Sequence, residues 1–338
     1  MATIHDVAKR AGVAPITVSR VINNSGYLSR ETRQRVEAAI AELEYVPNRL
    51  ARSLRSKRTN TLALVLTDIT NPFFTTLARG VEDTASDAGY TVIFCNTDES
   101  EAEERKYVQV LLQQQVDGIL LVPAANTGES IESIQKQNTP LVVLDRRPPP
   151  AVAVDTVRCE NEAGAYQLVR LLLDLGHRRI GILSGPIGVS TADDRLAGYR
   201  RAMREAGISD ADQLVVYGSF SQASGYDLMR DLLQTEQRPT AVFAANNLIG
   251  IGALKAVQAA GLRVPDDVAL VSFDDLPPTL LTFPFFTVAA QPAYDMGRRA
   301  TELLLSRLRG AAPEHAREII LPVELIVRQS SGQPINRP

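Results

Sequence analysis

The first 45 residues place apolar side chains at helical spacing, in three segments. The first expected helix begins after Thr3, which can cap it, and ends at Gly12. The second begins at Pro15, where a missing N–H is tolerated, and the third follows Ser29, from about Arg30 to Glu44. The apolar faces are Ile4, Val7, Ala8 and Ala11; Val18, Val21 and Ile22; and Val36, Ala39, Ile40 and Leu43. The pattern predicts a three-helix bundle that begins with a helix-turn-helix.

From Thr61 onward, short apolar runs alternate with helical stretches. Expected strands lie near residues 62–66, 91–95, 118–122 and 141–144, with helices near 74–88, 101–114 and 130–137. A second series has helices near 161–175, 193–206, 222–233 and 248–260, and strands near 180–183, 214–217, 241–244, 268–273 and 323–328. Such alternation indicates an α/β core of two doubly wound parallel-sheet subdomains, with a ligand cleft between them.

The expected domain boundaries follow these changes of pattern. Residues 1–46 form the helix-turn-helix domain, 47–60 a short basic segment, and 61–330 the core. Within the core, one subdomain comprises about 61–160 and 291–321, and the other about 161–290 and 322–330. The segment 47–60 is too short to hold as an isolated helix in water, so taken alone it is equally well a charged linker.

Charge divides the chain in the same place. Residues 1–60 hold 11 Lys and Arg against 5 Asp and Glu, whereas residues 61–338 hold 25 against 34. The basic head therefore carries a net charge of +6 and the acidic body −9, although the whole chain has only −3. This asymmetry is typical of a DNA-binding module attached to a regulatory domain.

Several classes of protein are disfavoured by what the sequence lacks. No apolar run approaches the length of a membrane span, and the N-terminus lacks a signal peptide's apolar centre, so we expect a cytoplasmic protein. Cys95 and Cys159 lie far apart and form no metal-binding spacing, which predicts no disulfide and no metal site. Gly250 and Gly252 form only a lone G-x-G within a helical pattern, so we expect neither a dinucleotide cofactor nor an enzyme.

Polar and aromatic side chains follow the expected strands at the point where each strand ends. A sugar offers C–H faces that stack on aromatic rings and hydroxyls that pair with carboxylate and guanidinium groups. Two groups of these side chains also have a simpler interpretation. Phe73 and Phe74 can be ordinary core residues, and Asp145 with Arg146 can be a solvated ion pair in a loop. The candidate effector-binding residues are Asn71, Phe73, Phe74, Asp145, Arg146, Arg195, Phe220, Asn246, Asp274 and Gln291.

The stretch TIHDVAKRAGVAPITVSRVINNSGYLSRETRQRVEAAIAELEYVPNRLARSLRS resembles the DNA-binding head of the lac repressor/purine repressor family of bacterial transcription factors. The family's usual helix-capping serine is replaced by Ala14. The resemblance implies that residues 47–60 form a hinge helix, which orders when two copies pair on operator DNA, and that Leu54 is a minor-groove wedge. The implied DNA-binding residues are Thr3, His5, Pro15, Ile16, Thr17, Ser19, Arg20, Asn23, Asn48, Ala51, Leu54 and Arg55.

The core resembles the periplasmic sugar-binding fold, and ribose-binding protein in particular carries matching residues at the strand ends named above. Compared with the purine repressor, Val189 replaces an arginine and Cys159 an aspartate of the effector pocket, which disfavours a purine.

The family resemblance implies a homodimer on a palindromic operator, which acts as a repressor of sugar-metabolism genes and is released by a monosaccharide such as ribose. The alternatives are a corepressor-type regulator that responds to a sugar phosphate or purine, and a solute-binding protein of the same fold.

Overall fold

The computed structural model describes residues 2–22, 24–45, 58–124, 126–209, 211–276 and 284–332. The chain divides into two compact units, Met1–Thr59 and Asn60–Pro338, called here the head and the core. Of the expected DNA-binding residues, Asn23, Asn48, Ala51, Leu54 and Arg55 lie outside the described residues, as does most of the expected hinge.

The head contains the three predicted helices, α1 (Ile4–Ala11), α2 (Pro15–Ile22) and α3 (Arg30–Glu42). The predicted cap of α1 is confirmed: the Asp6 backbone N–H donates to Thr3 Oγ1 at 3.4 Å, and the Thr3 backbone N–H donates to Asp6 Oδ2 at 2.8 Å. Gly12 ends α1 with a φ of 64°, a left-handed conformation that suits glycine. Val7, Val18 and Val36, one from each helix, are fully buried and form the centre of the head.

The start of α2 has no side chain that can cap it, because Ala14 occupies the position before Pro15. The Thr17 backbone N–H donates only to the Ala14 carbonyl, at 2.8 Å. We expect Ala14→Ser to stabilise α2 by about 0.5–1 kcal/mol, because the new hydroxyl can accept from the Thr17 N–H. Hydrogen exchange of the α2 amides in the full chain measures this.

The matched control for this prediction is Ser29→Ala, which should destabilise α3 by a similar amount. Ser29 Oγ accepts from the Thr32 N–H at 3.1 Å, so this variant removes the kind of bond that the other adds. Unchanged protection of α2 in Ala14→Ser, beside the expected loss in Ser29→Ala, would contradict the prediction.

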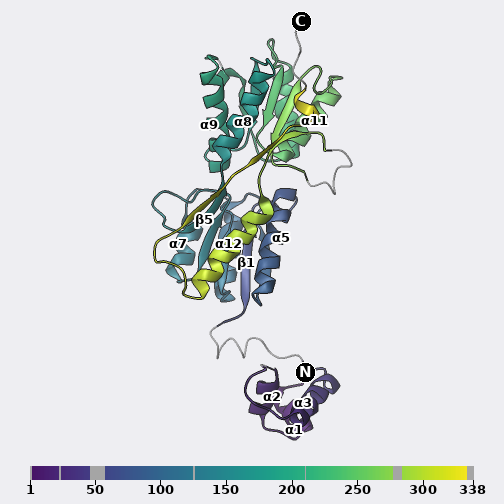
Figure 1. The fold of residues 1–338 in the computed structure, drawn as a ribbon, viewed down its shortest axis with the longest axis vertical. Helices are drawn as coiled ribbons and strands as arrows, with labels where there is room; N and C mark the ends of the chain where they lie inside the picture. The colour runs from purple at the N-terminus through teal and green to yellow at the C-terminus, as the bar shows by residue number, and fades with distance from the viewer. Residues whose placement is uncertain are drawn as a thin grey trace. The chain divides into compact units, whose positions relative to one another are not determined.

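The first lobe of the core is a six-stranded parallel sheet with the strand order β11-β5-β4-β3-β1-β2. Its strands are β1 (Thr61–Leu66), β2 (Thr91–Asn96), β3 (Gly118–Leu121), β4 (Leu141–Leu144), β5 (Asp155–Cys159) and β11 (Glu318–Leu321). The helices α5 (Pro72–Asp87), α6 (Glu101–Gln113), α7 (Glu129–Lys136) and α12 (Ala293–Leu308) cover it (Figure 1). The strands β1, β3 and β4 are almost wholly buried, which explains their continuous apolar runs.

The second lobe has the strand order β12-β10-β9-β8-β6-β7. Its strands are β6 (Ile180–Ser184), β7 (Val215–Tyr217), β8 (Ala241–Ala244), β9 (Ala269–Phe273), β10 (Thr287–Ala290) and β12 (Glu324–Ile326). Its helices are α8 (Asn161–Asp174), α9 (Ser190–Glu205), α10 (Gln222–Leu233) and α11 (Asn247–Ala259), with 3-10 turns at Ala211–Leu214 and Gln329–Ser331. We expected a wholly parallel sheet, but β12 pairs antiparallel with β10.

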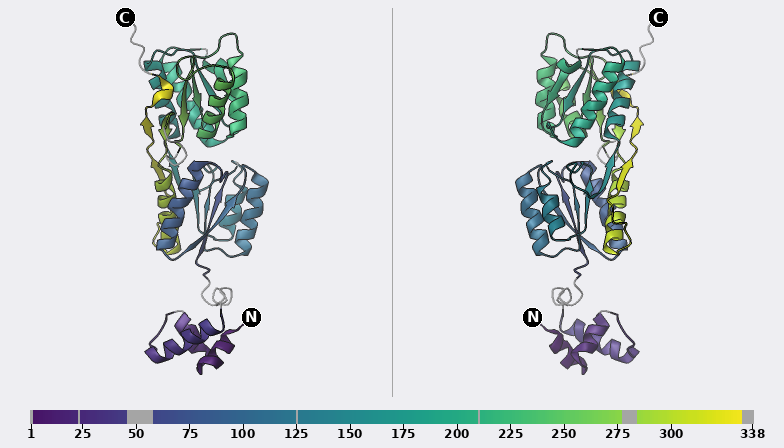
Figure 2. Two further views of the ribbon diagram at one scale, coloured as in Figure 1. Left: turned by 90° about the vertical axis from the view of Figure 1, so that its right-hand side faces the viewer. Right: turned by 90° about the vertical axis from the view of Figure 1, so that its left-hand side faces the viewer.

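The chain passes between the lobes three times, after β5, after β10 and after β11, and Figure 2 shows these segments side by side at one edge of the core. As a result α12 and β11 belong to the first lobe, although they follow most of the second lobe in sequence. No helix among the described residues is long and apolar enough to cross a membrane.

Candidate functional site

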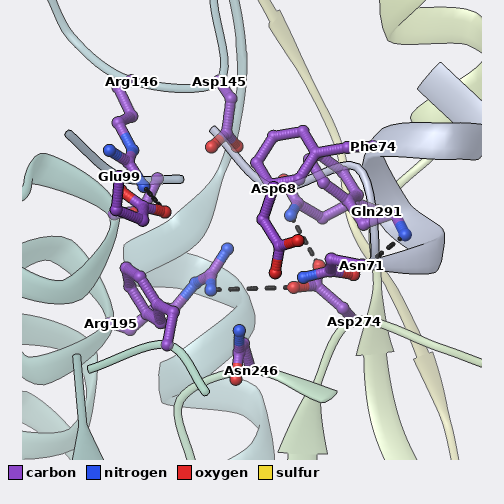
Figure 3. A pocket seen from close by; sticks show the side chains of 13 residues that line it. Asp68, Asn71, Phe74, Glu99, Asp145, Arg146, Arg195, Asn246, Asp274 and Gln291 are labelled. Carbon is purple, nitrogen blue, oxygen red and sulfur yellow. Dashed lines mark hydrogen bonds and ion pairs between the residues drawn. The ribbon is translucent and has the colours of Figure 1, made fainter. Parts of the chain in front are cut away.

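The two lobes enclose a cavity at the carboxyl ends of their parallel strands (Figure 3). The structure brings all ten candidate effector-binding residues to its wall, together with Asp68, Glu99 and Thr191, which the sequence analysis missed. Asp68 and Glu99 follow β1 and β2 in the loops where the other candidates were sought, so the same strand-end signal applies to them. That the ten candidate residues contact a ligand stays a prediction.

Asp145 and Arg146 follow β4 and are both nearly inaccessible to solvent. The Arg146 guanidinium donates through Nη2 to Glu99 Oε1 at 2.6 Å and through Nη1 to the Pro123 carbonyl at 2.8 Å. Its Cζ lies 6.0 Å from the centre of the Phe220 ring of the other lobe. The pair is therefore a fixed part of the cavity wall, and not the solvated loop pair that the simpler interpretation expected.

Arg195 and Asp274 form the wall contributed by the second lobe. Arg195 donates through Nε to Asn161 Oδ1 at 2.8 Å and through Nη1 to the Ala245 carbonyl at 2.7 Å. Its guanidinium stacks on Phe273 at 3.9 Å and lies 3.8 Å from Asp274 Oδ2. Asp274 Oδ1 in turn accepts from Gln291 Nε2 at 2.6 Å. These fixed partners orient both charged groups toward the cavity before any ligand arrives.

Two asparagines serve as helix caps at the cavity. Asn71 Oδ1 accepts from the Phe73 N–H at 3.0 Å and Asn246 Oδ1 from the Ile249 N–H at 2.8 Å. Asn71 Oδ1 also accepts from Asn247 Nδ2 of the opposite lobe, at 3.0 Å. The neighbouring Phe73 and Phe74 pack edge to face, with ring centres 5.0 Å apart, and both are buried in the core of the first lobe while lining the cavity. The two interpretations of these rings are thus compatible.

Within the part of the chain that the structure describes, three polar atoms of the wall are buried without a hydrogen-bond partner: Asp145 Oδ1, Arg146 Nε and Gln291 Oε1. Such atoms are costly unless something pairs with them. The cavity has a volume of about 30 Å³, which is enough for one or two waters. A larger ligand therefore needs the lobes to separate before it can be admitted.

Burial of Asp145 raises the pKa of its carboxyl to about 6, against the opposing effect of Arg195 and Arg146. Asp274 and Glu99 add to the rise, so four charged groups surround this carboxyl. Without ligand, the raised pKa stabilises the folded protein below the ordinary pKa of an aspartate, and this contribution is lost as the pH rises through about 6.

We expect effector binding to weaken as the pH falls through about 6, because the protonated Asp145 is a poorer acceptor for a ligand hydroxyl. Calorimetric titrations between about pH 5 and pH 8 should show this slope. Asp145→Asn removes the titrating group and should flatten the slope; an unchanged slope in that variant would assign the titration to another residue.

The head presents a separate candidate surface for DNA on α2. Pro15, Ile16 and Arg20 are exposed, with half of the Ile16 side chain accessible, whereas Thr17 and Ser19 are partly buried. Thr3, which caps α1, and His5 in its first turn are exposed as well. Val18 and Val21 face the core of the head, which leaves the opposite face of α2 available to a groove.

Two family models match the chain over almost its whole length. The model described as bacterial regulatory proteins of the lacI family matches residues 3–48, and that for periplasmic binding proteins and the sugar binding domain of the LacI family matches residues 59–329. The ribose operon repressor of Halalkalibacterium halodurans is 39% identical over 331 residues, which are 98% of this chain and 97% of that protein.

Solved structures agree with these matches. A lac repressor dimer bound to operator and the anti-inducer ONPF is similar with a TM-score of 0.84 and 28% identity, covering 98% of this chain and 99% of that one. A LacI-family transcriptional regulator from Enterococcus faecium with bound ribose has a TM-score of 0.73 and 29% identity, covering 82% of this chain and 100% of that one. With the geometry of the head and the cavity, these likenesses show that the chain belongs to the LacI family of bacterial transcriptional regulators.

Proposed function

We propose that the protein is a homodimeric repressor that binds a palindromic operator through its head and is released by a neutral monosaccharide, with ribose as the first candidate. The observation that carries this proposal is the cavity wall, where fixed charged groups stand beside buried, unpartnered polar atoms. Hydroxyls both donate and accept, so a polyol satisfies donors such as Arg146 Nε and acceptors such as Asp145 Oδ1 at once.

The charges of the wall favour an uncharged ligand. Four carboxylates, those of Asp68, Glu99, Asp145 and Asp274, line the cavity against the two guanidinium groups of Arg146 and Arg195. Both arginines are already engaged by protein acceptors. A phosphate would thus meet uncompensated negative charge, which disfavours a sugar phosphate. Support for ribose comes from the related ribose operon repressor and from the Enterococcus regulator with bound ribose.

Operator binding is supported by the charge and the helices of the head. One α2 helix reads only a few base pairs, whereas two copies related by a two-fold axis read a pseudo-palindrome with half-sites one helical turn apart. The similarity to a lac repressor dimer on its operator supports the same assembly. Sugar binding then changes the arrangement of the lobes and thereby the pairing of the segments at 47–60, with a coupling free energy of roughly 1–3 kcal/mol.

The proposal assigns neither an enzymatic activity nor a cofactor to the cavity, and it places the protein in the cytoplasm with its DNA. It also explains the basic head, for which a transport protein of the same fold has no use.

The proposal is tested by operator release. An operator is first obtained by selection from random DNA, and its complex with the full-length protein is titrated with ribose, ribose 5-phosphate or hypoxanthine while fluorescence anisotropy is recorded. We expect ribose alone to lower operator affinity. Tighter binding with hypoxanthine, or release by the phosphate only, would replace the proposed effector by one of the alternatives.

A further inference from the structure

Outside the cavity wall, one residue of the first lobe contacts two residues of the second. Arg147 Nη1 lies 2.7 Å from Asp194 Oδ1, and the Arg147 backbone N–H donates to Ser190 Oγ at 2.9 Å. Arg147 follows β4 in the first lobe, while Ser190 and Asp194 belong to the first turns of α9 in the second. The side chain of Asn126 adds a hydrogen bond to the Gly188 carbonyl beside them.

These contacts lie directly beside the candidate effector residues in sequence. Arg147 follows Arg146, and Asp194 precedes Arg195, yet neither Arg147 nor Asp194 lines the cavity. The Arg147 side chain is 46% exposed and that of Asp194 15%, whereas Arg146 and Arg195 are almost completely buried. The contacts therefore bridge the two lobes at the rim of the cavity without reaching the space a ligand would occupy.

We propose that Arg147, Ser190 and Asp194 form an interlobe latch, which holds the lobes closed and sets how long the effector stays bound. The part of this proposal that concerns the effector rests on the proposed function, whereas the part that concerns the closed lobes does not. The three are positioning residues, since they act on the ligand only through the position of the lobes.

The expected kinetics follow from where the latch acts. A ligand larger than water is admitted only to an open form, in which the bonds across the rim are absent. Loss of the latch therefore increases the rate at which the lobes open and release the ligand. It also enlarges the open fraction of the ligand-free protein, so the association rate should rise as well. Because Asp194 is mostly buried, its pair with Arg147 is less screened by water than an exposed pair of the same length.

The test uses the full-length protein and ribose in stopped-flow binding. We expect Arg147→Ala and Asp194→Ala each to speed ribose dissociation about three- to tenfold, with an association rate that is equal to or higher than that of the wild type and never lower. The double variant should dissociate no faster than the single ones, because both remove the same pair. The exchanged pair, Arg147→Asp with Asp194→Arg, should restore part of the slow dissociation.

Arg230→Ala is the matched control. The Arg230 side chain is 48% exposed, close to the 46% of Arg147, and it pairs with Asp227 at 2.8 Å within α10. This variant therefore removes an arginine of matched exposure whose ion pairs do not bridge the lobes. It should leave both rates unchanged.

A ligand-free measurement separates the latch from the identity of the effector. Spin labels at Lys136→Cys on α7 and Arg204→Cys on α9, two exposed positions in different lobes, report the interlobe distance by double electron–electron resonance (Figure 1). We expect Arg147→Ala to shift the distances of the ligand-free protein toward longer values. Such a shift in a protein that does not bind ribose supports the latch and rejects the proposed effector. Unchanged distances together with additive effects of the two alanine variants on ribose dissociation would overturn the latch.

Discussion

Arg195→Ala should weaken effector binding by about 1.5–3 kcal/mol, roughly 10- to 150-fold in Kd, while operator affinity without effector stays nearly unchanged. The guanidinium is held by Asn161, Ala245 and the Phe273 ring, so its direction toward the cavity is fixed in advance. A ligand hydroxyl that it binds would be left without a buried partner. Calorimetry with ribose measures the loss, and operator titration measures what is retained.

The same result is expected for Asp274→Ala, because Gln291 Nε2 would lose its acceptor along with the ligand. Asp274→Asn, which keeps the shape and one acceptor oxygen, should lose less. Since both positions are buried, thermal unfolding of each variant must accompany the titrations. A stable Asp274→Ala protein with full effector affinity would show that the sugar-binding assignment is wrong at this position.

The residues of the cavity could be predicted from the sequence where their proximity depends only on the placement of the parallel strands. In parallel sheets the carboxyl ends of the strands meet at one edge, so residues as distant as Asn71 and Asp274 fall together once the strands are placed. Thr191 was missed because it lies in the first turn of α9, which begins at Ser190 and so earlier than the expected position 193. The sequence gives no signal for the precise start of that helix, since the preceding Val189 makes no capping bond.

Of the core elements that the sequence analysis missed, the strand β5 depends on contacts made across the sequence, whereas the helix α12 does not. The strand β5 contains Asp155, which is buried and breaks the apolar run. Burial alone would raise its pKa, but hydrogen bonds from Arg307 and Arg317 hold the pKa below the ordinary value for an aspartate. Both arginines follow the second lobe in the chain, so no local pattern could show that this carboxylate is paired. The helix α12 did carry a signal, since Met296, Ala300, Leu303 and Leu304 recur at helical spacing.

Distant contacts also explain why the latch was not predicted. Arg147 and Asp194 look like ordinary solvated charges in the sequence, and only the closure of the lobes brings them within 2.7 Å. The relative position of Arg147 and Asp194 depends on how the two lobes face each other. The lobes are connected by the three passages of the chain after β5, β10 and β11, which lie apart from both residues in the sequence.

Arg20→Ala should remove base preference at one position in each half-site of the operator. Among the exposed residues of α2, Pro15 has no side-chain donor and Ile16 offers only an apolar surface, which can contact a thymine methyl but cannot make paired hydrogen bonds. Arg20 is exposed on the same helix and can fork onto the O6 and N7 atoms of a guanine, a contact that discriminates by about 1–3 kcal/mol. A dimer makes this contact twice, so the loss per operator is roughly 2–6 kcal/mol.

Selection of binding sites from random DNA measures this preference directly, and Lys57→Ala is its control. We expect Lys57, which lies outside the described residues, and Arg58 to contact phosphate. Lys57→Ala should therefore reduce the salt dependence of binding by about one unit of slope per protomer and leave the selected sequence unchanged. The two variants thus separate base reading from charge, because each removes one cation but only Arg20 is predicted to contact the bases. If Arg20→Ala selected the wild-type operator with undiminished preference, α2 would have to read DNA through the apolar surfaces of Pro15 and Ile16 and through the shape of the groove.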